Sequence, residues 1–294
     1  MPSGDSPHGS RSVMRHLVQP GPVSVDRIES YACDGREISF RLQPGLSLNQ
    51  ALTAPLVAAG MQSAAITFSG GVLSPCVYVV PAQPLDALHV AYFSTSHFPA
   101  RAEISLANAT FGWRDGEPFV HCHGTWMEPD GQLHGGHLMP HETFIHTGTE
   151  VRAWATPDIR VNAEPDAETN FTLFRPLPVT QRKGRFVVAR VRPNEDICLA
   201  LEAICRRHGI HAATLCASLG SLIGTQFTTG SAVTDHATEV LVRSGRVDTN
   251  IAGELRAEVE MLVVDMQGNM REGWLVRGKN PVCITFELML YSDA

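Results

Sequence analysis

Long apolar runs are absent from this sequence. The longest ones, such as VYVVPA and AAITF, fall well short of the roughly 18 residues that a membrane-spanning helix needs. Residues 1–22 mix proline, glycine, serine and charge without the apolar core of a secretory signal, and we interpret them as a disordered lead-in. These absences predict a soluble, cytoplasmic protein without a membrane partner.

A cysteine framework is also absent. The seven cysteines are an odd number, and none of them forms a CxxC pair. In the reducing cytoplasm such cysteines are small apolar residues rather than disulfide partners. We therefore expect most of them to be buried.

Positive charge is scarce. Lysine and arginine total 23 against 30 aspartates and glutamates, which gives a net charge of −7. This balance opposes the counterion release that drives most binding to DNA or anionic lipid. The one dense basic cluster, Arg182, Lys183 and Arg185, is typical of a solvated linker between domains.

What the sequence does contain is an internal repeat. A shift of 149 positions aligns QPGLSLNQALTAPLVAAGMQSAAITFSGG with RPNEDICLALEAICRRHGIHAATLCASLG, so that Pro44 meets Pro193 and Gly60 meets Gly209. Further on, a shift of 137 aligns DGQLHGGHL with QGNMREGWL. The chain is therefore predicted to be a tandem duplication, with a first domain over residues 23–180 and a second over residues 181–294.

The two shifts differ because the first copy carries about twelve extra residues. We place them in an irregular segment from about Pro81 to Glu117, as a longer loop. Long ordered loops are often functional, so this loop is a candidate part of a site.

Each copy is predicted to begin with a helix and then a strand. Ile197, Leu201 and Ile204 recur at helical spacing, and AATLCAS is short and strand-like. LRAEVEMLVVD and VCITFELML show the apolar alternation of further strands. The pattern predicts an α+β fold of two tandem domains, each an antiparallel β-sheet with a packed helix.

Capping residues mark the ends of both helices. In the second copy Asn194 is the expected N-cap, and Gly209 suits the left-handed position after the last turn. In the first copy Ser47 and Gln50 have the spacing of a capping box.

Histidines gather in one short stretch. Six of the thirteen lie between residues 121 and 146. FVHCHGTW is predicted to be a strand, which places His121 and His123 on one face and Cys122 on the other. The turn signal DGQ then reverses the chain, so that GGHL returns alongside and His137 completes a triangle.

Three neutral imidazoles on one face predict a divalent metal site. They suit zinc best among common ions, with iron, nickel, copper or manganese as alternatives. Gly135 and Gly136 leave space beside His137 and tolerate unusual backbone angles. An H-x-H pair alone is also typical of two unrelated exposed side chains, so the returning GGH is needed for the prediction.

The second copy lacks all three candidate ligands. The positions that match His121, His123 and His137 hold Glu258, Glu260 and Trp274. Because the three histidines are absent together from the second copy, we expect them to belong to one site. Tryptophan does not ligate metal ions. We therefore expect the second copy to be structural.

The HCH and GGHL segments, preceded by a helix–strand unit that ends in a glycine-rich turn, resemble the PPC (plant and prokaryote conserved) domain. The resemblance covers residues 36–165 and 184–292 approximately. It implies a strongly bent antiparallel sheet, a tendency to form trimers and, in prokaryotic members, a metal ion held by three histidines, here His121, His123 and His137. The site and fold are also similar to those of the acetolactate decarboxylases, which place HxH and GGH around a catalytic zinc.

The family resemblance also brings a DNA-binding label. Plant members act on chromatin through AT-hooks, and prokaryotic members are named predicted DNA-binding proteins. This sequence contains no AT-hook, since neither RKGR at 182–185 nor SGRVD at 244–248 has the required pattern. The missing hook and the negative charge argue against direct DNA binding.

Two hypotheses of different class follow. The first is a metalloenzyme acting on a small oxygen-rich metabolite, with Glu142, Glu128 and His141 as candidates for proton transfer. In that hypothesis Arg101 or His134 would meet a substrate carboxylate. The second is a non-catalytic binding protein, either a DNA-associated regulator or a sensor whose metal is structural. A homo-oligomer, trimer or dimer, is expected in either case.

Overall fold

The computed structural model describes residues 15–180 and 182–293. Residues 1–14 of the expected lead-in lie outside this range. Residues 15–22 form no helix or strand, but Arg15 Nη1 donates to the carbonyl of Val233 at 2.6 Å and Gln19 Nε2 to that of Cys283 at 2.8 Å. This part of the segment is ordered, in contrast to our expectation, because its polar side chains reach backbone acceptors of the second domain.

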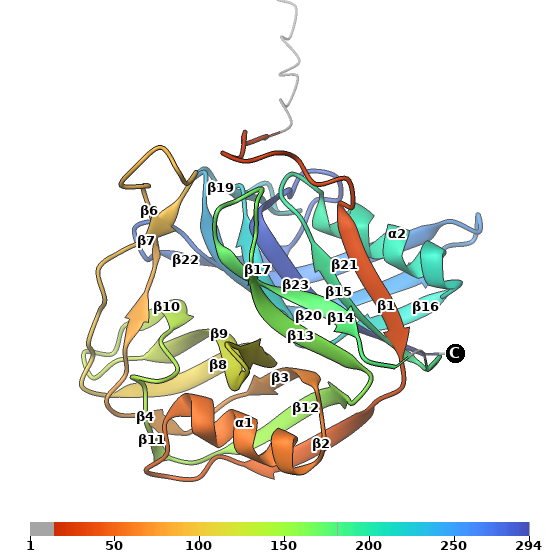
Figure 1. Cartoon of the computed structure of the whole chain (residues 1–294). Helices are drawn as coiled ribbons and strands as arrows, with labels where there is room; N and C mark the ends of the chain where they lie inside the picture. The colour runs from red at the N-terminus through yellow and green to blue at the C-terminus, as the bar shows by residue number, and fades with distance from the viewer. Residues whose placement is uncertain (1–14, 181, 294) are drawn as a thin grey trace, which may run out of the picture.

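The fold consists of two antiparallel sheets with one helix each, which confirms the predicted α+β class (Figure 1). The first sheet has the order β2 (Arg36–Arg41), β12 (Glu150–Thr156), β3 (Ser63–Phe68), β8 (Ala102–Arg114), β9 (Glu117–Met127), β10 (Leu133–Leu138) and β5 (Tyr78–Val79). Four further strands attach to it: β4 (Val72–Leu73), β11 (Ile145–Thr147), β13 (Ile159–Pro165) and β14 (Thr172–Pro178). One parallel bridge, between β13 and β8, interrupts the antiparallel pattern.

The second sheet repeats the core of the first. Its order is β1 (Ile28–Cys33), β15 (Phe186–Val191), β23 (Val282–Ser292), β16 (Ala212–Leu215), β20 (Thr238–Thr249), β21 (Leu255–Val264) and β22 (Met270–Trp274), with β17 (Leu219–Leu222) beside β20 and β23. Two small ribbons, β6 (Pro81–Ala82) with β7 (Tyr92–Phe93) and β18 (Thr225–Gln226) with β19 (Ala232–Val233), lie outside both sheets.

The first strand of the chain belongs to the second sheet. β1 pairs with β15 along its whole length, from Ile28 opposite Val191 to Cys33 opposite Phe186. The chain then crosses to the first sheet and returns to the second only at β15. The expected first domain of residues 23–180 therefore contributes its first strand to its neighbour.

Both helices begin and end on short-range signals. In α1 (Leu48–Ala58) the side chain of Ser47 accepts from the backbone N–H of Gln50, as predicted. In α2 (Ile197–His208) Gly209 takes the left-handed conformation, also as predicted, but the N-cap is Asp196 and not Asn194. Asn194 has φ 67° and its side chain bonds to the backbone of Leu17, so the helix starts two residues later.

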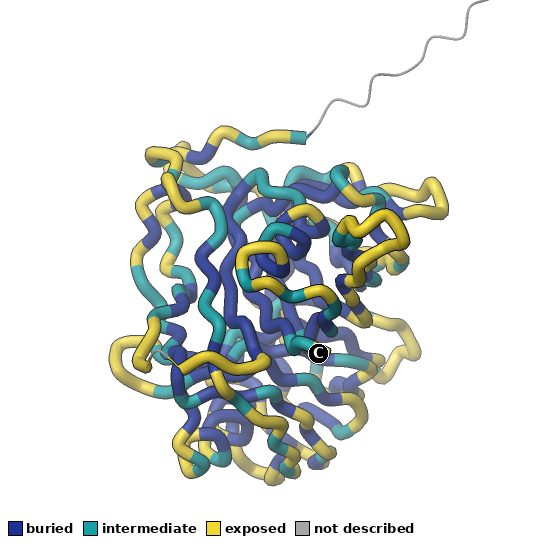
Figure 2. The backbone as a smooth tube through the Cα atoms, turned by 90° about the vertical axis from the view of Figure 1, so that its right-hand side faces the viewer, coloured by how far each residue is buried: buried dark blue, intermediate teal, exposed yellow. Residues whose placement is uncertain are grey.

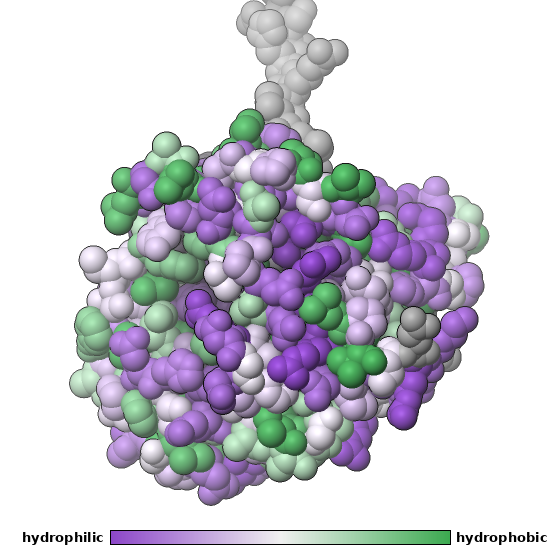
Figure 3. Space-filling view, viewed as in Figure 1, coloured by the Kyte–Doolittle hydropathy of each residue, from purple (hydrophilic) through white to green (hydrophobic). Residues whose placement is uncertain are grey.

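The extra residues of the first copy form an excursion between β4 and β8 that carries the β6–β7 ribbon. It ends before Ala102, earlier than the expected boundary near Glu117, because residues 102–114 form a regular strand. Leu85 and Leu88 on it are exposed, and Figure 3 shows apolar side chains, in green, at this upper left part of the surface.

Burial follows the sheets. All seven cysteines are buried and unpaired, which confirms their expected role as small apolar residues. The buried backbone, dark blue in Figure 2, runs through the interior and exposed loops surround it. Among the described residues no helix has the length and apolar character needed to span a bilayer.

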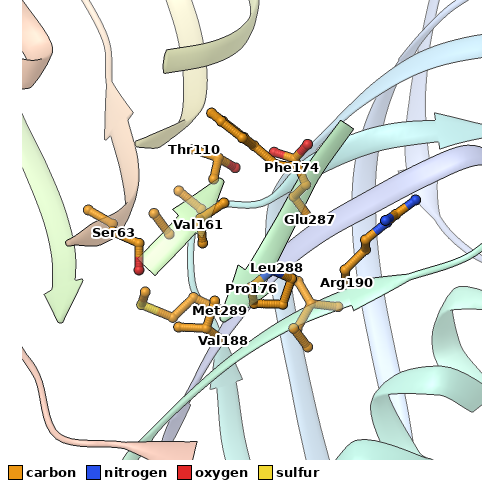
Figure 4. A pocket seen from close by; sticks show the side chains of 14 residues that line it. Ser63, Thr110, Val161, Phe174, Pro176, Val188, Arg190, Glu287, Leu288 and Met289 are labelled. Atoms are coloured by element: carbon orange, nitrogen blue, oxygen red, sulfur yellow. The ribbon is translucent and has the colours of Figure 1, made fainter. Parts of the chain in front are cut away.

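The two sheets pack against each other through an apolar layer. Val161 of β13 and Phe174 of β14 lie opposite Val188 of β15 and Met289 of β23 (Figure 4). The cavity between them has a volume of only about 20 Å³, room for about one water molecule. The domains are therefore closely packed, and groups at their boundary are held in fixed positions.

A buried ionic cluster closes one end of this layer. Asp166, in the turn between β13 and β14, accepts hydrogen bonds from Arg190 Nη2 and Arg192 Nη1, each at 2.7 Å. Glu29 of β1 lies 3.4 Å from Arg192. Burial alone would raise the pKa of Asp166, but the two guanidinium groups lower it to about 2.

We expect Asp166→Asn to lower the free energy of unfolding at pH 7 by about 2 kcal/mol, since each unit of pKa shift corresponds to roughly 1.4 kcal/mol. The pKa of this carboxyl is depressed, so its contribution is complete above about pH 4 and is lost as the pH falls towards 2. Urea unfolding of the parent and the variant at pH 7, 5, 4 and 3 measures the difference. The control is Asp115→Asn, an exposed turn residue with φ 53° that asparagine tolerates. A difference in the free energy of unfolding that is absent at pH 7, or that does not change with pH, would contradict this role of Asp166.

Candidate metal centre

The three predicted histidines lie together on adjacent strands. His121 and His123 point from the same face of β9, and His137 of β10 is directly opposite His123 in the register. The imidazole centroids lie 4.7 to 5.3 Å apart. One ring nitrogen from each residue lies within 4.8 Å of the others, so the three can hold one ion.

Local contacts fix the positions of β9 and β10. Asn49 of α1 donates to the carbonyl of Pro118 and accepts from the N–H of Val120, which anchors β9 immediately before His121. A Cβ on Gly136 would lie 2.5 Å from a carbonyl oxygen of β5, and one on Gly135 would lie 2.9 Å from side chains of the second domain. Neither glycine has a positive φ, so they permit close approach and not the unusual backbone angles that we expected.

The second domain packs against the face of β8 and β9 that carries the histidines. Asn108, the cross-strand neighbour of His123, donates from Nδ2 to the carbonyls of Ser218 and Val242, at 3.1 and 2.7 Å. This contact brings the start of β20 and the middle of β23 against the histidines. Glu239 and Glu287, on these two strands, reach the site.

Hydrogen bonds decide which nitrogen of each ring carries a proton. His123 Nδ1 lies 3.0 Å from the carbonyl oxygen of Val240, and His121 Nδ1 lies 3.0 Å from Glu287 Oε1. Both neighbours are acceptors, so both Nδ1 atoms donate, and in the neutral rings both Nε2 atoms keep a lone pair. These Nε2 atoms lie 3.0 Å apart, and Glu239 Oε2 lies 2.8 Å from that of His123. Three electron-pair donors thus converge, and they repel one another unless a proton or a metal cation lies among them.

The distances fit a metal ion. Two nitrogens at about 2.0–2.1 Å from zinc in tetrahedral geometry lie about 3.3–3.4 Å apart. The observed 3.0 Å between the two Nε2 atoms is within a few tenths of an ångström of that value. His137 Nδ1 is buried and has no hydrogen-bond partner among the described residues, as expected of an imidazole whose polar surface belongs to a ligand site.

The environment separates the pKa values of two of the rings. Burial alone would lower the pKa of His123, but the carboxylate of Glu239 and the carbonyl of Val240 favour its charged form and raise the pKa above its ordinary value. Burial, followed by the charges of His121 and His123, holds the pKa of His137 well below its ordinary value. His123 therefore takes up a proton more readily than an ordinary histidine, and His137 less readily.

A cavity of about 450 Å³ lies between the domains beside the histidines. His121 and His137 line it at one end, together with Glu239 and Glu287 of the second domain. Its walls include Phe93, Phe119, Phe171 and Phe174. Its size and largely apolar lining with a few convergent polar groups are those of a small-molecule site.

The other predicted site residues divide into two groups. His141 and Glu142 line the cavity. Glu128 lies beyond the end of β9, where its Oε1 accepts from Trp126 Nε1 at 3.1 Å and lies 3.9 Å from His134 Nδ1. Glu128, His134 and the exposed Arg101 do not line the cavity, so the structure does not bring them to the histidines.

Glu239 and Glu287 were not among the site residues predicted from the sequence. Their side chains are 10% and 6% exposed, and each lies in a largely apolar run of its strand. Carboxylates are rarely buried unless a cation or hydrogen-bond donor faces them. An isolated acid in runs such as TEVLV and TFELML is the signal that was available.

The second copy holds an ion pair where the first holds its histidines. Glu258 and Trp274 are exposed, and Glu260 lies 4.0 Å from Arg243, which also pairs with Glu272. Among the described residues the three histidines are the only group of this kind with metal-ligand spacing.

Comparison with known proteins identifies both copies. The sequence profile of the Plants and Prokaryotes Conserved (PCC) domain matches residues 29–154 and 179–293. No curated protein matches the chain significantly. The resemblance to acetolactate decarboxylases stays a prediction.

The solved structures that resemble this chain each match about half of it. A metal-containing protein from Archaeoglobus fulgidus is 21% identical, with 48% of this chain and 94% of that chain covered and a TM-score of 0.40. A plant- and prokaryote-conserved protein from Pyrococcus horikoshii is 20% identical, with 49% and 94% covered and a TM-score of 0.39. A candidate DNA-binding protein from Ralstonia eutropha is 21% identical, with 48% and 90% covered and a TM-score of 0.36.

The histidines provide a test of the geometry without any metal. In metal-free protein we expect His123 to be protonated at a higher pH than His137, because Glu239 favours charge on the first ring and burial opposes it on the second. NMR of ¹⁵N-labelled imidazoles measures both, with His123→Gln and His137→Gln assigning the signals. Zinc should abolish both titrations, since it replaces the proton. A His137 signal that titrates at or above that of His123 would contradict the arrangement.

Proposed function

This chain belongs to the Plants and Prokaryotes Conserved domain family in two tandem copies, and on that premise we propose that it is a zinc-dependent enzyme acting on a small oxygen-containing molecule. The ligands are His121, His123 and His137 of the first copy. The second copy supports the site and holds no metal of its own.

One observation carries the proposal. The Nδ1 protons of His121 and His123 are committed to acceptors in the second domain, so both Nε2 lone pairs face the same point as a carboxylate oxygen of Glu239. Three neutral imidazoles suit zinc among the common divalent ions, and the carboxylate beside them favours a cation at that point. When bound, the ion supplies a Lewis acid that polarises an oxygen of the bound molecule.

The residues around the histidines have separate tasks. Glu287 holds the Nδ1 proton of His121, which orients the ring and makes it a better ligand. Glu239 Oε2 is placed to accept a proton from a hydroxyl group of the bound molecule, at the end of the cavity lined by His121 and His137. The aromatic walls exclude water from that end and orient the molecule.

We expect one zinc ion per chain after purification, and loss of that ion in His137→Ala, because two imidazoles are too few for a structural or catalytic zinc site. Glu287→Gln should keep the ion but bind it about 10- to 100-fold more weakly, since a partner that orients a ligand is typically worth that much. Elemental analysis and competition with a chromogenic chelator measure stoichiometry and affinity. His146→Gln, an exposed histidine of β11, is the matched control. A parent protein that contains and binds no divalent metal would refute the proposal.

The alternative is a non-catalytic, DNA-associated protein whose metal is structural. The net charge of −7 opposes it. We expect no salt-sensitive binding of the zinc-loaded protein to duplex DNA at about 0.1 M salt, measured by fluorescence anisotropy. An affinity that falls steeply between about 50 and 200 mM salt would favour the alternative, because it reports release of counterions from phosphates.

A further inference from the structure

The cavity beside the histidines has two chemically distinct ends. At one end His121, His137, Glu239 and Glu287 surround the proposed metal position. Arg114 lines the same cavity, at the far end of the β8–β9 hairpin. What lies between these ends limits what the cavity can bind.

One face of the β8–β9 hairpin forms a wall of the cavity. Cross-strand pairs follow one another on the same face: Thr110 with His121, then Gly112 with Phe119, then Arg114 with Glu117. Successive pairs on one face are about 7 Å apart along the strands. The guanidinium of Arg114 lies over the ring of Phe119, 5.2 Å from its centroid, and Phe119 is one such step from His121.

Aromatic rings enclose the space between. Phe119 and Phe174 pack edge to face with centroids 6.0 Å apart, and Phe93 and Phe171 do so at 6.2 Å. Phe93 also lies 5.3 Å from the ring of His137. Gly112 is required beneath this wall, since a Cβ there would lie 3.0 Å from the ring of Phe174 and 2.5 Å from the carbonyl oxygen of Val161.

Arg114 has no carboxylate partner among the described residues. Glu117 is directly opposite it in the hairpin, yet the two do not form an ion pair, and the contact that Arg114 makes is with Phe119. Arg114 is exposed where it lines the cavity, and a guanidinium without a carboxylate partner there is well suited to bind an anionic group through two hydrogen bonds.

We propose that the cavity binds a small aromatic carboxylate that carries a second, neutral oxygen group at the opposite end of its ring. Arg114 binds the carboxylate, the phenylalanines pack against the ring, and the hydroxyl or carbonyl oxygen points to the histidines. The orientation follows from charge, because Glu239 and Glu287 already place two carboxylates at the metal end and would repel a third.

The second copy supports this assignment. The strand registers match the pair Thr110–His121 with the pair Arg246–Glu258, so Arg114 corresponds to Asn250 and Phe119 to Arg256. The arginine and the aromatic ring are thus absent from the copy that also lacks the histidines. The inference rests on the proposed metal site for one of its two ends.

Isothermal titration calorimetry of the zinc-loaded full chain with 4-hydroxybenzoate tests the proposal. We expect binding by the parent, and binding about 10- to 100-fold weaker in Arg114→Gln, the range expected for a hydrogen-bonded pair of charges. Arg101→Gln, an exposed arginine at the other end of β8 and outside the cavity, should bind as the parent does. Phenol, which lacks the carboxylate, should bind weakly and equally to the parent and Arg114→Gln.

Zinc content is measured on the same samples, which separates this proposal from the preceding one. A parent that holds zinc but does not bind 4-hydroxybenzoate, or that binds it no better than Arg114→Gln, overturns the aromatic carboxylate and leaves the metal site standing. A parent without zinc refutes the metal site instead. Arg114→Gln should retain the parent's zinc and melting temperature, which shows that weaker binding does not reflect a damaged fold.

Discussion

Hydrogen bonds across the domain boundary decide the chemistry of the histidines. The carbonyl of Val240 and the carboxylate of Glu287 take the Nδ1 protons of His123 and His121, and both acceptors belong to the second domain. In the first domain alone these nitrogens would face water, and the rings would exchange between tautomers. The apolar layer, the ionic cluster around Asp166 and the clamp from Asn108 all hold the two acceptors at the correct distance. The site is thus a property of the pair of domains.

The sequence predicts much of this fold because its signals are local or periodic. The repeat, the α+β class, the cap at Ser47 and the strand register that unites His121, His123 and His137 each follow from spacing alone. The carboxylates and the carbonyl from the second domain could not be found that way, since their role depends on how two sheets pack. Asn194 illustrates a related limit: it is a good N-cap by composition, but a tertiary contact with Leu17 holds it outside the helix.

The duplication has let the two copies specialise. In a single domain each residue near the metal must also support folding of that domain. Here the second copy has Glu258, Glu260 and Trp274 at the matching positions, and Glu239 and Glu287 of its sheet face the candidate site of the first copy. The burial of Glu239 and Glu287 costs stability unless cations face them, which is a cost that function in the neighbouring domain explains.

The exchange of β1 has a consequence for biosynthesis. Residues 28–33 pair only with residues 186–191, so the first strand made by the ribosome has no partner until more than half of the chain has emerged. Until then its hydrogen-bonding edge is open, and an open edge invites pairing with other chains. Folding must also close a loop of this length before the second sheet is complete, which slows it relative to a fold with local pairings. The edge of β1 therefore stays unpaired for longer in this nascent chain than it would in two independent domains.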